Sequence, residues 1–264
     1  MCQNPMKPTA HEIIRIHKET PTVWSFRVQW DTPPHFGQFF MVSLPRRGEA
    51  PVTTSAIGDN WVELTIRNVG KVTDAIHQLR VGDHLFMRGP YGNGFPMEEF
   101  KNRHLVIAAG GSGVSPVRPL IEHYHNHPDQ IAQLDLLLGF RDPDAILFKE
   151  DIRRWKTTFD MTLTVDRAPE EWDGNVGLIT QYIQSLTLSD VDKMDVIIVG
   201  PPAMMKFTVQ GFLNRNIPPE QLMVSMERRM SCGIGKCGHC KVSDCYVCLD
   251  GPVFRYHEAA KLID

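Results

Sequence analysis

The sequence predicts three consecutive parts: a small β-barrel or β-sandwich, a parallel α/β domain and a short cysteine-rich module. Three observations lead to this prediction. Apolar and polar residues alternate in the first hundred positions, strand-like and helix-like stretches alternate from about residue 104, and five of the six cysteines fall between Cys232 and Cys248. The boundaries that we predict within the 264 residues are 1–100, 101–226 and 227–264.

The composition is that of an ordinary globular protein, with 42% hydrophobic and 22% charged residues. The formal net charge of −3 gives no basic bias toward nucleic acid. No apolar run approaches the roughly 18–20 residues of a membrane span. Residues 1–5 lack the basic region and apolar core of a signal peptide. We therefore expect a cytoplasmic protein that neither binds nucleic acid nor crosses a membrane.

The first hundred residues are predicted to form β-strands. The stretches "VWSFRVQW" (23–30) and "WVELTIR" (61–67) alternate between apolar and polar side chains, as half-buried strands do. Further short strands are predicted within 37–45 and 83–95. Two conspicuous loops, "RNVGKVT" (67–73) and "GPYGNGF" (89–95), could each be a plain hairpin turn.

The middle of the chain predicts a five-strand parallel sheet. Apolar strand-like runs occur at 104–110, 134–140, 161–166, 196–200 and 222–226, with helix-like stretches such as 116–127 and 177–187 between them. This alternation is typical of a parallel sheet covered by helices on both faces. Ligands of such sheets bind at the carboxyl ends of the strands.

The loop "AGGSGVSP" (109–116) directly follows the first of these strands. Gly110, Gly111 and Gly113 allow a ligand to approach the backbone closely, and Ser115 followed by Pro116 predicts the start of a helix. A glycine-rich loop before a helix N-terminus suits a pyrophosphate group. The alternative is an ordinary glycine-rich turn.

Two further loops are predicted at the same edge of the sheet. Arg141 in "GFRDPD" (139–144) follows the second strand, where a cation can meet a ribose or a phosphate. It could equally be a solvated surface charge. The loop "VGPPAMMKF" (199–207) is another strand-to-helix turn, for which ordinary turn chemistry is the alternative.

The cysteine spacing predicts an iron–sulfur cluster. Cys232-x4-Cys237-x2-Cys240, followed by a later cysteine, has the plant-type 2Fe–2S spacing. Spacing alone leaves the fourth ligand open between Cys245 and Cys248, and we favour Cys248 because the loop must turn back. A zinc site is the alternative, although only four residues separate the two Cys-x2-Cys pairs, against roughly 12–20 in a zinc ribbon.

Glycines within the cysteine segment support the cluster interpretation. Gly233, Gly235 and Gly238 allow the loop to wrap a compact cluster and to turn backbone N–H groups toward the sulfurs.

A barrel, an α/β domain and a cysteine-rich tail in this order resemble the ferredoxin-reductase-like flavoproteins, more closely the branch that ends in a 2Fe–2S module. That branch includes the dihydroorotate dehydrogenase electron-transfer subunit, the gamma subunit of cytoplasmic NiFe hydrogenases and the electron-transfer subunit of anaerobic sulfite reductase. The motifs "GPYGNGFP", "GPPAMM", "ERRMSCGIGKCGHC" and "YVCLDGPVF" are similar to the last two. The short interval from Cys240 to Cys248 and the "LID" ending are most similar to the sulfite reductase subunit.

The resemblance implies FAD bound to the barrel. It assigns flavin contacts to two segments, which contribute Pro51, Val52, Thr53, Thr54 and Arg67, Gly70, Lys71, Val72, Thr73. Thr53 would face the N5 edge of the flavin, and the hydroxyl of Thr73 would meet its pyrophosphate. The first segment departs from the family's Arg-x-Tyr-Ser/Thr pattern, because Ala50 stands in place of the arginine and Val52 in place of the aromatic residue.

The resemblance also assigns the nucleotide and cluster ligands. NADH or NADPH would contact the glycine loops and the cation after the second strand, namely Gly110, Gly111, Gly113, Pro116, Arg141, Gly200, Pro201, Pro202 and Met204. The cluster ligands would be Cys232, Cys237, Cys240 and Cys248, which leaves Cys245 as an extra thiol. Val199 departs from the cysteine that many relatives have there.

The implied activity is electron transfer from NAD(P)H through FAD and a 2Fe–2S cluster, with no catalytic side-chain set. The acceptors would be catalytic and ferredoxin-like partner subunits of a larger complex, with a sirohaem sulfite reductase favoured and a NiFe hydrogenase second. A self-sufficient reductase and a non-enzymatic assembly subunit with a zinc-stabilised tail are the competing hypotheses.

Overall fold

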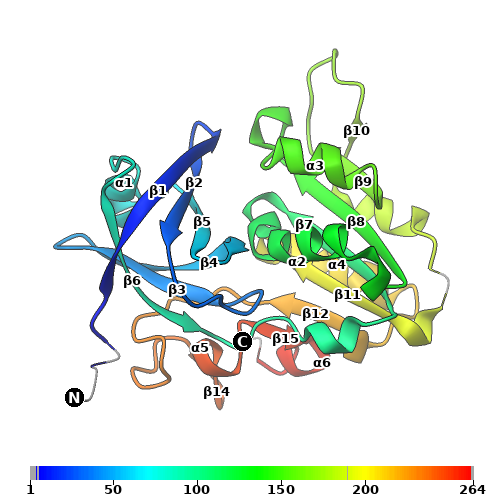
Figure 1. The fold of residues 1–264 in the computed structure, drawn as a ribbon. Coiled ribbons are helices and arrows are strands. Elements are labelled where there is room, and N and C mark those ends of the chain that lie inside the picture. Colours follow the sequence, from blue (N-terminus) through cyan, green and yellow to red (C-terminus); the bar gives the residue numbers. More distant parts are fainter. Residues whose placement is uncertain (1–3, 5, 189, 263–264) are drawn as a thin grey trace. The chain divides into compact units, whose positions relative to one another are not determined.

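The computed structural model describes residues 4, 6–188 and 190–262 (Figure 1). The chain forms two compact units, one of Met1–Phe95 with Met226–Val253 and one of Pro96–Ser225 with Phe254–Asp264. The cysteine-rich segment is therefore grouped with the first hundred residues. Cys2 and the last two residues of the "LID" ending lie outside the described residues.

The first unit contains a closed barrel of six strands in the order β1-β2-β5-β4-β3-β6, which confirms the predicted barrel. Its strands are β1 (Thr9–Thr20), β2 (Val23–Gln29), β3 (Phe39–Leu44), β4 (Gly48–Gly58), β5 (Trp61–Arg67) and β6 (His84–Tyr91). The sequence did not predict β1 and β4. Both lack clean alternation, and β4 contains Pro51, a residue that weakens a strand signal.

The barrel is filled by the inward-facing apolar side chains of its strands. Phe26, Val28, Phe40, Val62 and Leu64 are fully buried members of this core. The loop at 67–73 is not a hairpin turn, because it leads into the short helix α1 (Lys71–Ile76), whose Ile76 closes the core. The apolar alternation seen in 23–30 and 61–67 therefore marks the inner face.

The second unit is built on a seven-stranded sheet in the order β10-β9-β8-β7-β11-β12-β15. The five predicted strands are β7 (His104–Gly110), β8 (Gln133–Phe140), β9 (Asp160–Val165), β11 (Met194–Val199) and β12 (Leu222–Ser225), and their pairings are parallel. The edge strands β10 (Asn175–Val176) and β15 (Val253–Arg255) are additions, too short to show a sequence pattern.

Two longer helices, α2 (Val114–Asn126) and α4 (Pro202–Leu213), follow β7 and β11. The other helices are short, namely α3 (Lys149–Trp155), α5 (Val247–Asp250) and α6 (Tyr256–Ala259). The predicted helix at 177–187 is a 3-10 helix, Ile179–Ser185. A two-stranded hairpin, β13 (Lys241–Val242) and β14 (Cys245–Tyr246), lies within the cysteine segment.

Strand β7 lies where the strand order of the sheet reverses. The chain proceeds from β7 outward through β8 and β9, then returns to place β11 on the other side of β7. Every residue of β7 is buried, as expected for a central strand covered on both faces. Because ligands of open parallel sheets bind at such a reversal, the carboxyl ends of β7 and β11 are the expected nucleotide site.

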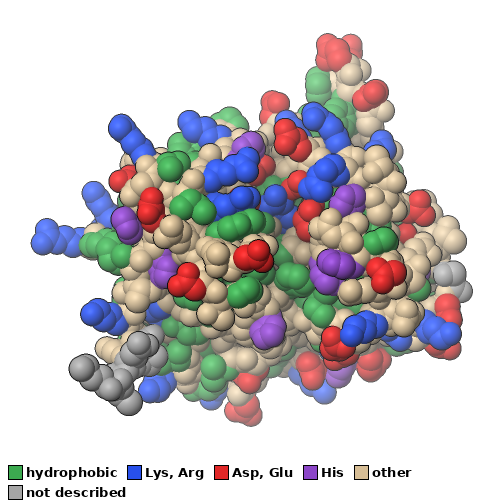
Figure 2. All heavy atoms as spheres, in the orientation of Figure 1, with side chains coloured by type: hydrophobic (Ala, Val, Ile, Leu, Met, Phe, Trp, Pro, Cys, Tyr) green, Lys and Arg blue, Asp and Glu red, His purple; other side chains and the backbone are tan. Residues whose placement is uncertain are grey.

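No described helix combines the length and the apolar character needed to cross a membrane. Acidic and basic side chains are interspersed over the face shown in Figure 2, in keeping with the small net charge of −3.

Truncating the barrel core tests the fold of the first unit. Val62→Ala removes two methyl groups from a fully buried site, and we expect a loss of about 2–3 kcal/mol in the free energy of unfolding. Val81→Ala is the matched control, because Val81 is 60% exposed, and it should change stability by less than about 0.5 kcal/mol. Urea unfolding measures both, and equal effects would contradict the assigned core.

Candidate cofactor and cluster sites

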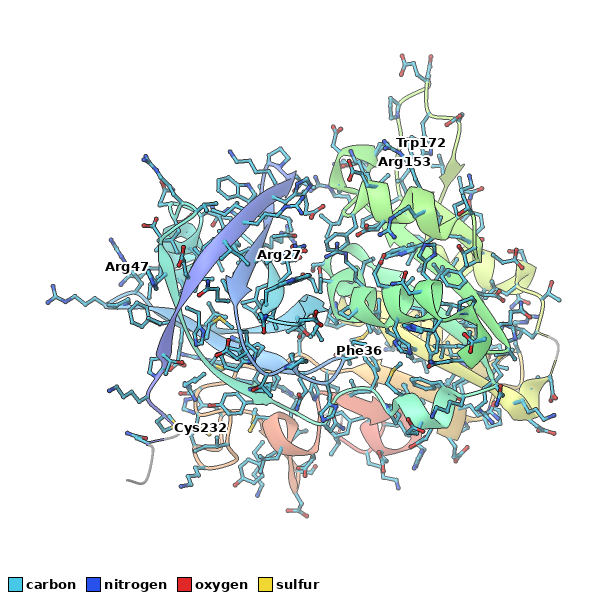
Figure 3. The ribbon with its side chains drawn as sticks, in the orientation of Figure 1. Arg27, Phe36, Arg47, Arg153, Trp172 and Cys232 are labelled. Atoms are coloured by element: carbon cyan, nitrogen blue, oxygen red, sulfur yellow. The ribbon has the colours of Figure 1, made fainter. Side chains whose placement is uncertain are left out.

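The cysteine segment folds into a loop that buries three of its thiols. Cys232, Cys240 and Cys248 are buried, Cys245 is half-buried and Cys237 is exposed, and all five are free thiols. Figure 3 labels Cys232 on the loop that follows β12. Disulfides therefore do not explain the cysteine content of the described chain.

Backbone amides of the loop point at two of the sulfurs. The Sγ atom of Cys232 accepts from the N–H groups of Ile234, Lys236 and Cys237 at 3.3–3.4 Å. The Sγ atom of Cys248 accepts from the N–H of Gly235 at 3.2 Å. Such amides stabilise thiolate sulfur, the form that binds iron.

Positive φ angles at Gly233, Gly235 and Gly238 make this arrangement possible. A Cβ atom at Gly233 would lie 2.8 Å from the ring of Tyr91. Both the lack of space and the positive φ angle therefore exclude other residues at this position. The glycine pattern predicted in the sequence therefore has a direct structural reason.

The thiols of the four predicted ligands interact with one another. Backbone hydrogen bonds at His239 and Cys232 lower the pKa of the Cys237 thiol, and the Cys232 thiol adds to this effect. Burial raises the pKa of the Cys248 thiol to about 12, and its neighbours Cys240 and Cys232 act in the same direction. Cys232 therefore interacts with Cys237 and with Cys248, and Cys248 also interacts with Cys240.

Among the described residues, no three His, Cys, Asp or Glu side chains converge on one point as the ligands of a single metal ion would. Cys245 lies on β14 opposite Val242, in the hairpin between Cys240 and Cys248.

Strand β4 contains the first predicted flavin segment, and the hydroxyls of its two threonines differ in their hydrogen bonds. The hydroxyl of buried Thr54 donates to the carbonyl of Gln38 at 3.4 Å. Thr53 is half-buried and pairs with Phe39 across the strands, and its hydroxyl has no hydrogen-bond partner within the described chain. Thr53 is therefore the hydroxyl that a ligand could use, whereas Thr54 serves the fold.

The second predicted flavin segment is a loop held by its own threonine. The hydroxyl of Thr73 accepts from the N–H groups of Val69 and Gly70 at 2.9 and 3.0 Å and donates to the Gly70 carbonyl at 3.0 Å. This hydroxyl was predicted to meet a pyrophosphate, but the loop itself uses it. Arg67 and Lys71 are exposed and make no ion pair among the described residues.

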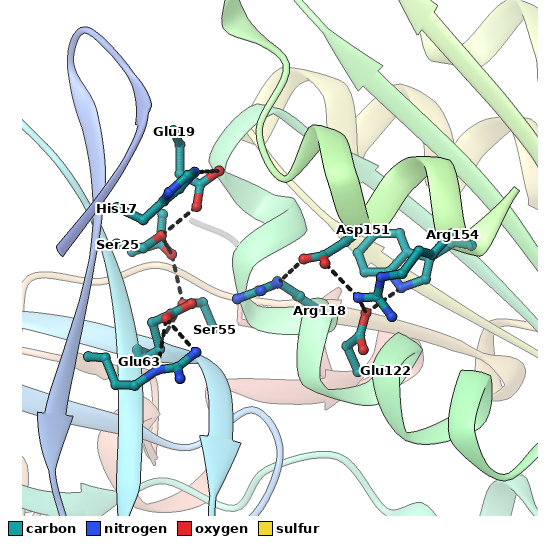
Figure 4. Close-up of polar contacts among 12 residues, drawn as sticks. His17, Glu19, Ser25, Ser55, Glu63, Arg118, Glu122, Asp151 and Arg154 are labelled. Atoms are coloured by element: carbon teal, nitrogen blue, oxygen red, sulfur yellow. Dashed lines mark hydrogen bonds and ion pairs between the residues drawn. The ribbon is translucent and has the colours of Figure 1, made fainter. Parts of the chain in front are cut away.

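A row of polar side chains on β1, β2, β4 and β5 was not predicted from the sequence. Ser25 donates to Glu19 at 2.9 Å and bonds to Thr65, which donates to Ser55 (Figure 4). Glu63 pairs with Arg27 at 3.2 Å. In the sequence these residues occupy polar positions of their strands, which are usually exposed. The burial of Ser25, Ser55 and Glu63 depends on the tertiary structure, so the sequence did not indicate it.

The structure brings two of the three predicted nucleotide loops together. A Cβ atom at Gly110 would lie 2.8 Å from the sulfur of Met204, and one at Gly113 would lie 2.7 Å from the carbonyl carbon of Val199. The loop after β7 and the loop after β11 are therefore packed backbone against backbone. Gly110 and Gly113 are the residues that permit this contact.

Helix α2 begins earlier than the sequence predicts. A 3-10 turn over Gly111–Gly113 continues into the helix at Val114, so Ser115 is not its N-cap and Pro116 is the third helical residue. The prediction was wrong because the glycine turn is itself helical. The hydroxyl of Ser115 is buried and has no hydrogen-bond partner among the described residues.

Arg141 extends from the end of β8 with 67% of its side chain exposed. It donates to Asp142 at 2.9 Å, and this contact lowers the pKa of the Asp142 carboxyl. Gly139 pairs with Gly110 in the sheet, which places this strand end next to the glycine loop. In the same unit, Asp151 joins Arg118 to Arg154 (Figure 4).

The loop at 89–95 has a role that the sequence did not reveal. The guanidinium of Arg88, just before it, donates to the carbonyls of Ser231 and Cys232. Burial tends to lower the pKa of Arg88, but hydrogen bonds to Glu49 and Tyr91 outweigh it and raise the pKa. The motif "GPYGNGF" was conspicuous in the sequence. Nothing in it indicates that the neighbouring Arg88 contacts residues more than a hundred positions away.

Known protein families match two parts of the chain. Residues 107–210 match the oxidoreductase NAD-binding domain, and residues 227–260 match the iron–sulfur cluster binding domain of dihydroorotate dehydrogenase B. The first match contains the packed glycine loops, and the second contains all four predicted cluster ligands.

Relatives match over almost the whole chain. Sulfhydrogenase 1 subunit gamma of Pyrococcus furiosus is 32% identical, with 97% of this chain and 93% of that protein covered. The probable dihydroorotate dehydrogenase B (NAD(+)) electron transfer subunit of Methanocaldococcus jannaschii is 35% identical, with 94% and 90% covered.

Solved structures share the fold at lower identity. The NADH-dependent reduced ferredoxin-NADP oxidoreductase structure superposes with a TM-score of 0.78 at 23% identity, covering 99% of this chain and 94% of that chain. The chain therefore belongs to the family of NAD-binding, iron–sulfur oxidoreductase subunits with a ferredoxin-reductase-like fold that includes the sulfhydrogenase gamma and dihydroorotate dehydrogenase B electron transfer subunits.

Proposed function

We propose that the chain is an electron-transfer subunit that oxidises NADH or NADPH through FAD and passes single electrons through a 2Fe–2S cluster to partner subunits. The observation that carries this proposal is a loop that buries three of the four predicted ligand thiols and whose backbone amides donate to the sulfurs of Cys232 and Cys248. The four thiols, Cys232, Cys237, Cys240 and Cys248, would provide two ligands for each of two irons.

The barrel and the sheet supply the other two binding sites of this proposal. Thr53 would donate its free hydroxyl to FAD, while Pro51, Val52 and Thr54 would shape the strand behind it. Exposed Arg67 and Lys71 would meet the FAD phosphates, and Gly70, Val72 and Thr73 would hold that loop in place.

The nucleotide would lie at the carboxyl ends of β7 and β11. Its contacts would come from the packed glycine loops and their helix starts, which are Gly110, Gly111, Gly113, Pro116, Gly200, Pro201, Pro202 and Met204. Arg141 would reach the ribose or its phosphate from the adjacent strand end.

The order of the cofactors follows from electron counting. A nicotinamide donates two electrons as hydride, an iron–sulfur centre accepts one, and a flavin when bound can do both. The residues of this chain would orient the donor, hold the cluster and exclude water, so no proton-transferring side-chain set is required.

The partner that we propose is the catalytic subunit of an anaerobic sulfite reductase, together with a ferredoxin-like subunit. The short interval from Cys240 to Cys248, which resembles that family, supports it. The Pyrococcus furiosus relatives, which are sulfhydrogenase gamma subunits, favour a second candidate, in which this chain is a gamma subunit and its partner is the catalytic subunit of a NiFe hydrogenase. Supplying the reduced chain to each catalytic subunit, and measuring sulfite consumption against hydrogen evolution, separates the two.

Anaerobic purification tests the cofactor set. We expect about two irons and two sulfides per chain, one FAD, and bleaching of the visible spectrum by NADH or NADPH when each is added separately. A colourless zinc protein that ignores both nucleotides would instead support the non-enzymatic assembly subunit. Turnover with a free carrier protein, without a stable complex, would support a self-sufficient reductase.

Two cysteine substitutions identify the fourth cluster ligand. Cys248→Ser should abolish the cluster, because it removes a buried thiol that is paired with Cys240 and bonded to the Gly235 amide. Cys245→Ser is the matched control and should retain parental iron and sulfide. The opposite result would transfer the fourth ligand to Cys245.

Two threonine substitutions test the flavin assignment. Thr53→Val should slow reduction of the flavin by NAD(P)H about tenfold, the effect of one lost hydrogen bond of about 1.4 kcal/mol. Thr54→Val should reduce stability and leave that rate unchanged, since the Thr54 hydroxyl already bonds to Gln38. Rapid-mixing absorbance measures the rates, and an unchanged rate in Thr53→Val would remove this residue from the flavin site.

A further inference from the structure

The segment Arg88–Asn93, which we call the clamp segment, holds the cysteine module at both ends. At one end Arg88 donates to the carbonyls of Ser231 and Cys232, and at the other end the amide side chain of Asn93 donates to the carbonyls of Asp250 and Val253 at 2.9 and 2.8 Å. The four predicted ligands lie between these two attachment points along the chain.

The middle of the clamp segment packs directly against the module. The ring of Tyr91 occupies the space beside Gly233, and a Cβ atom at Gly92 would lie 2.7 Å from the ring of Pro252. The N–H of Asn93 also donates to the Gly251 carbonyl at 2.7 Å. The path of the cysteine loop is therefore determined by strand β6 and by the residues that follow it.

Arg88 brings a permanent positive charge to this contact. It is 5% exposed, and an arginine keeps its charge at every working pH. Its other partners include Glu49 on β4, at 2.6 Å and 3.0 Å from two guanidinium nitrogens, and the hydroxyl of Tyr91 at 3.4 Å. The cation contacts the backbone of Cys232 itself, and the carboxylate of Glu49 binds the same guanidinium.

The positions of the Arg88 cation and the Glu49 carboxylate have an electrostatic consequence for a bound cluster. Reduction adds one electron and hence one negative charge to the cluster. A buried cation beside a ligand residue stabilises that added charge, and a carboxylate nearby opposes it. Burial of Arg88 limits the screening of its charge by salt, whereas the side chain of Glu49 is 36% exposed, so salt screens its opposing effect more strongly.

We propose that Arg88 is a positioning residue that holds the Cys232 end of the cluster loop and raises the reduction potential of the cluster, while Glu49 lowers it. This inference rests on the proposed function, because it requires a cluster at the four cysteines. Because the reduction potential limits which acceptors the chain can reduce, Arg88 on β6 and Glu49 on β4 would influence that range of acceptors.

The test measures the reduction potential of the anaerobic holoprotein by electron paramagnetic resonance during a mediated titration. Arg88→Gln should lower the ratio of reduced to oxidised cluster at a fixed potential about tenfold, which is about 59 mV for a one-electron couple. Glu49→Gln should shift the ratio the opposite way. Arg88→Lys keeps the charge and should remain closer to the parent than Arg88→Gln.

Arg27→Gln is the matched control, because it breaks a similar arginine–glutamate pair on the same barrel without a contact to the cysteine loop. It should leave the potential unchanged. Shifts of the same sign in Arg88→Gln and Glu49→Gln, an unshifted potential in both, or an equal shift in Arg27→Gln would overturn the inference.

Two outcomes remain distinct from each other. If Arg88→Gln fails to retain its cluster, Glu49→Gln still tests the sign of the electrostatic effect, and Arg88→Lys tests whether retaining the charge keeps the potential near that of the parent. If the parent shows no paramagnetic signal on reduction, the proposed cluster is absent, and the proposed function fails before this inference does.

Discussion

A buried cation determines how the cysteine-rich segment returns to the barrel. Arg88 lies on strand β6 and donates to the carbonyls of Ser231 and Cys232, which follow β12 in the chain, more than 140 positions later. A buried guanidinium requires full hydrogen bonding, and Glu49 with two backbone carbonyls supplies it. The segment that can hold a cluster is therefore grouped with the barrel.

The parallel sheet obeys a different constraint, which is the close approach of two backbones. At the carboxyl ends of β7 and β11, Gly110 and Gly113 leave no room for a Cβ atom against Met204 and Val199. The reversal of strand order at β7 opens the edge of the sheet there. Glycine is therefore required at this point by packing alone.

These two constraints explain why the cofactors are handled by separate kinds of structure. A cluster needs thiols and amides held by a loop, and a loop of that kind needs an external support, here β6 and β4. A dinucleotide needs backbone and helix starts, which a parallel sheet provides by its own geometry.

Periodicity and spacing are local properties, so the sequence alone was enough to predict a small β domain, the five central strands of the sheet and the cysteine motif. It did not reveal β1, β4, the start of α2 or the loop use of the Thr73 hydroxyl, since weak alternation and competing local hydrogen bonds obscure these features. The contact of Arg88 with Glu49 and with the loop of Cys232 depends on the tertiary structure. These residues are 39 or more positions apart, and no local pattern encodes a buried charge whose partners come from distant strands.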